Sequence, residues 1–97
     1  MTLSRRRVVV TGMGIVSPLG IGVEKNWDAL TKGRSGIRRI QKFDASQLSS
    51  QIAGEIPDFN IDRYLPPKES RRLDSFCHYG YVASEKAIKE SQIEITE

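Results

Sequence analysis

Cys77 and His78 are the residues that first suggest chemistry, because a neighbouring histidine can activate a cysteine thiol as a nucleophile. They are the single cysteine and single histidine of the 97-residue chain. In the helix expected there, adjacent side chains point about 100° apart and do not face each other. We therefore interpret Cys77 as a small, mostly buried apolar residue and His78 as a partly exposed polar one. The sequence predicts no metal site and no cofactor.

A second candidate is the stretch Val8–Gly20, which reads VVVTGMGIVSPLG and resembles the start of a dinucleotide-binding fingerprint. The spacing G-x-G-x-x-G that begins at Gly12 and Gly14 would need a third glycine where Ser17 stands, and the loop holds no lysine. We therefore expect no nucleotide site. The two glycines are better explained as positions where another backbone approaches closely.

The third candidate is a basic cluster formed by Lys68, Arg71 and Arg72. Their spacing of i, i+3 and i+4 puts three cations on one face of a helical turn. Two interpretations stay open: a solvated face partly paired with Glu69 and Asp74, or a docking surface for an acidic partner or a phosphate. A further group of cations is interpreted as solvated surface, and it comprises Arg34, Arg38, Arg39 and Lys42.

Helices are expected over 23–32 and over Ser75–Ser91. Trp27 and Leu30 would form the apolar face of the first helix. Asp74 would cap the second helix. The buried side of the second helix is predicted to comprise Phe76, Gly80, Ala83 and Ala87. A single helical turn is expected over 61–65.

Val8–Val10 is predicted to be a strand buried on both faces, because β-branched residues run there without polar alternation. A shorter strand is expected over 51–56, and 93–96 looks strand-like. The segment 34–44 is interpreted as a loop with three apolar anchors, which are Ile37, Ile40 and Phe43. These elements indicate an α/β fold. A doubly buried strand needs more neighbours than they supply, so residues 1–97 are predicted to be the N-terminal segment of a larger domain.

Composition excludes several classes of protein. The net charge of +3 is too small to indicate nucleic-acid binding by itself. No apolar stretch approaches the roughly 18 residues of a membrane span. Ser4, Arg5 and Arg6 before an apolar run imitate a signal peptide, but the run contains glycines and lacks a small-x-small cleavage site. We expect a cytoplasmic protein that binds neither nucleic acid nor membrane.

The whole chain resembles the N-terminal portion of the beta-ketoacyl-acyl carrier protein synthases, closest to the synthase II type of fatty acid synthesis. The type II polyketide ketosynthases share the first half of the pattern and remain an alternative. The matching segments are Arg6–Gly20, Trp27–Leu30, Ser35–Ile37, Phe43–Asp44, Ala53–Gly54, Asp58–Asn60, Lys68–Glu69, Arg71–Asp74, Phe76, Tyr79–Gly80, Ala83 and Glu94–Thr96.

The resemblance implies the N-terminal part of a thiolase-like fold with five layers (αβαβα), incomplete in this chain, in an enzyme that is usually a homodimer. It implies an acyltransferase that performs a decarboxylative Claisen condensation with malonyl-acyl carrier protein. In that family a cysteine thiolate accepts the acyl group and two histidines assist. Cys77 and His78 match none of these positions, so no catalytic residue is expected in this chain and the chain alone is predicted to be inactive.

The resemblance also assigns a role to the basic cluster. Lys68, Arg71 and Arg72 stand where the synthase II pattern has the basic residues that dock the acidic helix of acyl carrier protein. The other class of function left open is a small non-enzymatic module that presents this basic helix to an acidic partner.

Overall fold

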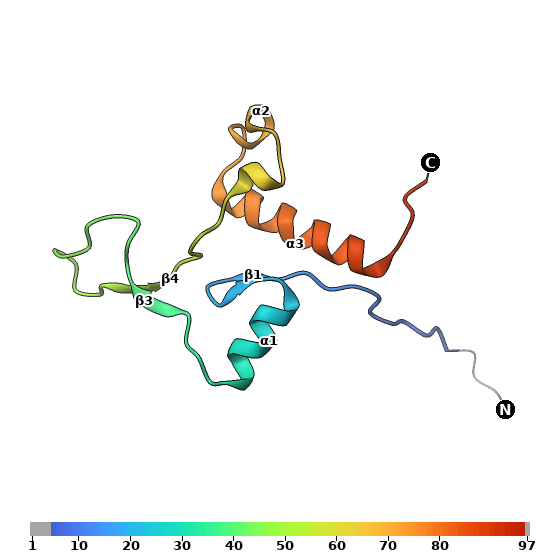
Figure 1. Ribbon diagram of the computed structural model, residues 1–97, viewed down its shortest axis with the longest axis horizontal. Coiled ribbons are helices and arrows are strands. Elements are labelled where there is room, and N and C mark those ends of the chain that lie inside the picture. The colour runs from blue at the N-terminus through green and yellow to red at the C-terminus, as the bar shows by residue number, and fades with distance from the viewer. Residues whose placement is uncertain (1–4, 97) are drawn as a thin grey trace.

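The computed structural model describes residues 5–96 and contains short strands and helices rather than one sheet (Figure 1). In chain order they are β1 (Val16–Ser17), β2 (Gly20–Ile21), α1 (Val23–Thr31), β3 (Ile37–Arg39), β4 (Ile52–Gly54), the 3₁₀ turn η1 (Ile61–Arg63), α2 (Pro67–Ser70) and α3 (Ser75–Ser91). The helices α1 and α3, the turn η1 and the strand β4 lie where the sequence predicts them. β1 pairs with β2, and β3 pairs with β4, each antiparallel.

The β1–β2 hairpin is fixed to α1 by one buried side chain. Asn26 is 4% exposed, and its side-chain oxygen accepts a hydrogen bond from the Ser17 hydroxyl. Its amide nitrogen donates to the carbonyl oxygens of Gly20 at 3.0 Å and Gly22 at 2.8 Å. These bonds join the hairpin turn to the first turn of α1, where the Gly22 carbonyl also accepts from the Asn26 backbone N–H at 3.3 Å. The tight turn and the start of α1 therefore form one unit.

The segment 34–44 is not the loop that the sequence predicts, because Ile37–Arg39 forms a strand. Ile37 pairs with Gly54 and Arg39 with Ile52. The predicted anchors Ile37 and Phe43 are 54% and 56% exposed. A strand is stabilised by a partner that lies far along the chain, and the local pattern around Gly36 carries no sign of it. The long loop between β3 and β4 lies at the left of Figure 1.

Val8–Val10 does not form the predicted buried strand in this chain. The three valines are 90%, 70% and 79% exposed, and the segment extends away from the other elements (Figure 1). Within residues 5–96 no strand pairs with it, and a strand requires a hydrogen-bonded neighbour. Residues 93–96 likewise form no strand, and Ile95 is 79% exposed.

Gly12 and Gly14 lie directly against the backbone of α3, which confirms their interpretation as positions of close approach. A Cβ atom added to Gly12 would lie 2.8 Å from the backbone nitrogen of Ser91. One added to Gly14 would lie 2.8 Å from the carbonyl carbon of Ala83. Both distances are well inside van der Waals contact, which lies at about 3.5–4.0 Å between carbon atoms. Only glycine permits this approach.

The buried side of α3 differs from the predicted one. Ala83 faces the glycine segment as expected, but Phe76 is 73% exposed and a Cβ atom on Gly80 would have no neighbour within 4 Å. Val82, which is not among the predicted residues, is completely buried. Apolar residues occur around the whole helix, so spacing alone does not decide which side faces the rest of the chain.

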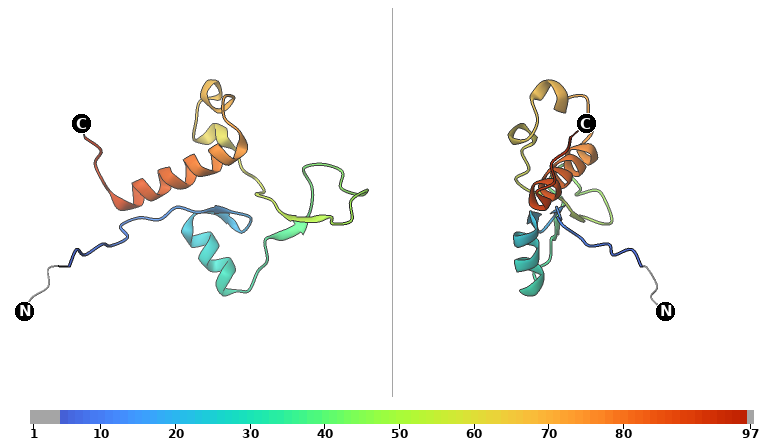
Figure 2. Two further views of the ribbon diagram at one scale, coloured as in Figure 1. Left: turned by 180° about the vertical axis from the view of Figure 1, so that it is seen from behind. Right: turned by 90° about the vertical axis from the view of Figure 1, so that its right-hand side faces the viewer.

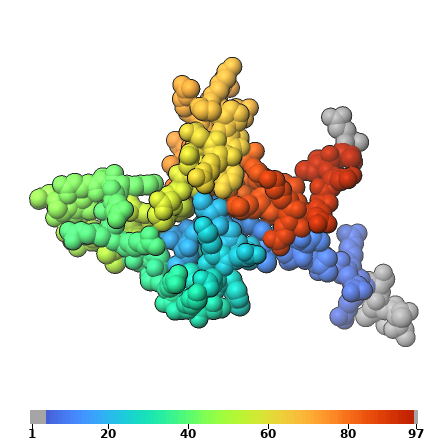
Figure 3. Space-filling model, in the orientation of Figure 1, coloured from blue at the N-terminus to red at the C-terminus, as the bar shows by residue number. Residues whose placement is uncertain are grey.

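The chain is extended for its length. Its radius of gyration is 18.0 Å, whereas a compact domain of this size has about 12.5 Å. Its accessible surface of 8460 Å² exceeds the roughly 5,600 Å² expected for a compact protein of this mass. Separate lobes are visible in Figure 3, and the right-angle view in Figure 2 shows how thin the arrangement is.

Apolar side chains that a complete core would cover are therefore exposed. On α1 the predicted apolar face is exposed, with Trp27 at 67% and Leu30 at 61%, while Ala29 and Asn26 are buried. Buried apolar residues are few among those that the structure describes, namely Ala29, Ala45, Leu65 and Val82. The helices and strands are present, but they do not enclose a core by themselves.

Candidate functional site

The basic cluster lies on α2 and the turn that follows it. α2 begins after Pro66, whose backbone is extended, and Pro67 occupies the first turn, where its missing N–H costs nothing. Ser70 is buried at 6% exposure, and its hydroxyl donates to the Pro67 carbonyl at 3.2 Å. Ser70 therefore lies on the side of the turn that packs against the rest of the chain. It projects from the upper edge of the molecule in Figure 1.

Lys68, Arg71 and Arg72 are all exposed on this coil. Arg71 keeps helical backbone angles, and the Arg72 N–H donates to the Glu69 carbonyl at 3.2 Å, so the coil continues past the end of α2. The spacing i, i+3 and i+4 therefore places the three cations along one side, as the sequence predicts. The Arg71 Nε also donates to the Pro67 carbonyl at 3.3 Å, which anchors the base of its guanidinium group.

The carboxylates beside the cluster do not neutralise it. Within residues 5–96 the ion pairs closer than 4.0 Å are Lys32–Asp28 and Lys89–Glu85. Neither Glu69 nor Asp74 forms one, so the partial pairing that the sequence suggested is not seen, and a solvated face and a docking surface both stay open. Asp74 does precede α3 as predicted, but its side chain makes no capping hydrogen bond, and its backbone carbonyl accepts from Cys77 and His78 instead.

Aromatic side chains hold the chain segment that enters α2. The rings of Phe59 and Tyr64 stack with centroids 6.3 Å apart. Phe59 also meets the ring of Tyr79 on α3 edge to face at 4.9 Å. Leu65, between this group and α2, is 8% exposed. Aromatic pairs of this geometry contribute about 0.5–1.5 kcal/mol beyond their buried area. They tie η1 and the start of α2 to α3.

His78 holds the other end of α2, a contact that the sequence interpretation missed. Its Nε2 lies 2.8 Å from the carbonyl oxygen of Ser70. A carbonyl oxygen only accepts, so Nε2 carries the hydrogen and donates. Cys77 and His78 are each half-buried. His78 donates its hydrogen bond to the backbone of α2 and not to the Cys77 thiol. No local pattern indicates this bond, because it joins two different helices.

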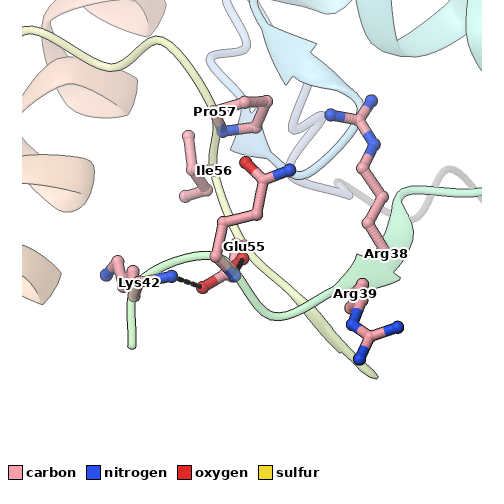
Figure 4. Close-up of a pocket in the computed structure, with 7 residues that line it drawn as sticks. Arg38, Arg39, Lys42, Glu55, Ile56 and Pro57 are labelled. Carbon is pink, nitrogen blue, oxygen red and sulfur yellow. Dashed lines mark hydrogen bonds between the residues drawn. The ribbon is translucent and has the colours of Figure 1, made fainter. Parts of the chain in front are cut away.

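A pocket of about 200 Å³ lies beside the β3–β4 hairpin (Figure 4). In its wall the Glu55 carboxylate accepts hydrogen bonds from the backbone N–H groups of Gln41 at 2.9 Å and Lys42 at 3.0 Å. These two donors, Gln41 first, hold the pKa of the Glu55 carboxyl below its usual range. Arg38 and Arg39 point in opposite directions (Figure 4), so the cations here do not converge on one point. The arrangement is a backbone clamp rather than an anion site.

Residues 5–96 lack two further features that would indicate a function. No group of three or more histidine, cysteine or acidic side chains could hold a metal ion. No described helix is both long enough and apolar enough to cross a membrane.

Comparison with known proteins relates the chain to one family. A sequence model described as "Beta-ketoacyl synthase, N-terminal domain" matches residues 5–97. Proteins named 3-oxoacyl-[acyl-carrier-protein] synthase 2 are 47% identical over 95 residues in Vibrio harveyi, 43% in Vibrio cholerae and 41% in Synechocystis. Each of these matches covers 98% of this chain and 23% of the relative. The chain thus spans about a quarter of the length of these curated relatives.

A solved structure shows the same arrangement of the backbone. It is titled "The ishigamide ketosynthase/chain length factor", is 34% identical, and superposes with a TM-score of 0.80 over 94% of this chain and 23% of that chain. The prediction of an α/β fold that forms the N-terminal part of the thiolase-like ketosynthase architecture, incomplete in this chain, is confirmed. The chain belongs to the beta-ketoacyl synthase family, within the N-terminal domain of that family.

Proposed function

We propose that this chain is the N-terminal segment of a 3-oxoacyl-acyl carrier protein synthase II. The observation that carries the proposal is the sequence identity of 41–47% to relatives with that name. This identity extends over nearly the whole chain. The reaction would be the acyltransferase step of fatty acid synthesis. A malonyl thioester loses carbon dioxide, and the resulting carbanion attacks the acyl thioester on the enzyme and releases the cysteine thiolate. Cys77 and His78 take no part in it.

Within this enzyme the segment supplies scaffold and docking surface rather than catalytic groups. The segment with Gly12 and Gly14 packs against α3. α3 contacts the α2 turn through His78 and the segment before it through Tyr79. The chain by itself is therefore proposed to be inactive. Its exposed valines and the exposed faces of α1 and α3 would be covered in the complete fold, which agrees with the extended shape of the chain. The homodimer and the cytoplasmic location stay predictions.

The α2 turn is proposed to dock acyl carrier protein. Lys68, Arg71 and Arg72 are exposed, and no carboxylate within residues 5–96 pairs with them. Unpaired surface cations of this kind steer an acidic partner and fix its register more than they add affinity. The effect weakens as salt shortens the Debye length, which is about 8 Å at physiological ionic strength.

Charge reversal in the full-length enzyme tests this docking role. The double variant K68E/R71E should raise the KM for carrier-bound substrate and leave kcat unchanged, and the difference from wild type should shrink as salt is added. A thioester substrate without carrier protein should show no change. A matched control is R34E/K42E, which reverses two exposed cations outside the α2 turn. An unchanged KM for carrier-bound substrate in K68E/R71E would contradict the docking role.

A type II polyketide ketosynthase is the second candidate, and the likeness to the ishigamide ketosynthase/chain length factor favours it. That protein is 34% identical to this chain, below the 41–47% of the synthase 2 relatives. Turnover of a saturated acyl chain on the carrier, followed by mass spectrometry of the elongated product, separates the two. The intact mass of the native protein separates both from a small non-enzymatic module of 97 residues.

A further inference from the structure

We propose that His78 is a positioning residue for the docking turn. The inference rests on the proposed docking role of the α2 turn. His78 holds the α2 turn in the orientation that presents Lys68, Arg71 and Arg72 together, through its hydrogen bond to the Ser70 carbonyl. It touches neither substrate nor the reacting atoms.

The bond lies at the point of the turn where it has most effect. Ser70 is the last residue of α2, and Arg71 and Arg72 follow it directly. Its carbonyl oxygen accepts from the Leu73 N–H at 3.1 Å and from His78 Nε2 at 2.8 Å. The orientation of the Ser70 peptide therefore determines where both arginines leave the helix.

α2 is too short to keep an orientation by itself. It has four residues, and isolated helices below about 12 residues are marginal in water. Its direction therefore depends on contacts with its surroundings. Two neighbouring residues of α3 supply such contacts: Tyr79 meets Phe59 before α2, and His78 meets Ser70 at its end. The aromatic contact holds the entry to the turn, and the histidine holds its exit.

The length of the side chain is what this role requires. In a glutamine side chain the amide nitrogen Nε2 can occupy the position of histidine Nε2. It can also donate to a carbonyl oxygen. Asparagine offers the same amide one carbon shorter and falls short of Ser70. H78Q and H78N therefore carry the same amide group and differ only in the length of the side chain. In both, the Ser70 carbonyl keeps its bond from Leu73, so neither variant leaves a buried acceptor without a partner.

The experiment measures steady-state kinetics of H78Q, H78N and wild type in the full-length enzyme. H78N should raise the KM for carrier-bound substrate by about 2- to 10-fold, the factor that the loss of one hydrogen bond implies. Its kcat and its KM for a thioester without carrier protein should not change. The KM of H78Q for carrier-bound substrate should lie close to that of the wild type. A KM for carrier-bound substrate that is the same in H78N and H78Q would overturn the proposal, as would an equal loss with the carrier-free thioester.

A double-mutant cycle separates this inference from the docking role itself. In the K68E/R71E background two of the three cations are reversed, so H78N should raise KM much less than it does in the wild type. If K68E/R71E raises KM and H78N does not, the positioning role is wrong and the docking role stands. If K68E/R71E leaves KM unchanged, the docking role is wrong, and the inference fails with it. A full additive effect of H78N in that background also contradicts positioning.

Discussion

Replacement of Gly14 by alanine should destabilise the full-length protein, because the added Cβ atom has no room against α3. That atom would overlap the carbonyl oxygen of Ala83 and would lie 2.8 Å from the carbonyl carbon of Ala83 and 3.0 Å from the backbone nitrogen of Ala87. All three atoms belong to helical backbone, which cannot rotate away as the end of a flexible side chain does.

The size of the effect follows from these distances. Ordinary carbon contacts lie at about 3.5–4.0 Å, so relief of the contact with the Ala83 carbonyl carbon alone needs a separation of roughly 0.7–1.2 Å, and the overlapped oxygen needs more. Overpacking of this kind costs about 1–3 kcal/mol. Because rigid groups are struck, we expect the upper half of that range, a loss of about 2–3 kcal/mol for G14A.

Gly80 is the matched control for Gly14. A Cβ atom on Gly80 meets nothing within 4 Å, and the residue lies inside α3. Within residues 5–96 G80A adds no overlap and gains up to about 1 kcal/mol of helix propensity, so it should cost much less stability than G14A. Urea denaturation followed by far-UV circular dichroism measures both variants. Equal midpoints for G14A and G80A would refute the reasoning.

G12V extends the test to function. The added side chain would meet the backbone of Ala87 and Ser91, so G12V should fold poorly or lose solubility before its substrate preference changes. Normal stability together with a changed preference for acyl chain length would show that this segment lines a binding site instead of packing as scaffold. Product analysis by mass spectrometry provides that readout.

The remaining predictions concern two polar clamps. N26A should lower the free energy of unfolding by about 1–3 kcal/mol, since it leaves the Ser17 hydroxyl and the Gly20 carbonyl without the partner they have now; a change below about 0.5 kcal/mol would contradict this. E55Q should speed hydrogen exchange at the amides of Gln41 and Lys42, because a neutral amide oxygen accepts more weakly than a carboxylate. The pKa of Glu55 is lowered in the folded chain, so its stabilisation is complete above the ordinary Glu value of about 4.3 and is lost as the pH falls through the folded-state value. The difference in exchange between E55Q and wild type should close in that acidic range, and a difference that persists there would rule out the carboxylate as its cause.

The helices could be predicted from local signals, because a helix satisfies its own backbone hydrogen bonds. α1 ends one residue before the predicted end, and Gly33 with φ of +68° follows it, as expected for a glycine after a helix C-terminus. α3 has the predicted bounds, although Asp74 precedes it without the expected side-chain cap. The shared side of Lys68, Arg71 and Arg72 could be predicted for the same reason, since their spacing along one coil is a local property.

The prediction of strands failed where a partner strand far along the chain determines whether a segment forms a strand. The strand β3 forms because Ile52–Gly54 lies beside it, and residues 34–44 contain no trace of that pairing. Val8–Val10 has the composition of a buried strand and no neighbour within residues 5–96. A strand is stable only with both a ladder partner and a covered face, and neither is encoded next to it in the chain.

The sequence by itself determined the family, the helices α1 and α3 to within one residue, the close approach at Gly12 and Gly14, and the spacing of the cations of the α2 turn. Only the tertiary structure decided which side of α3 is buried and which residues hold the α2 turn in place. The reason is physical: spacing describes one element, whereas the hydrogen bond from His78 to Ser70 joins two elements whose relative orientation depends on the packing of the whole chain.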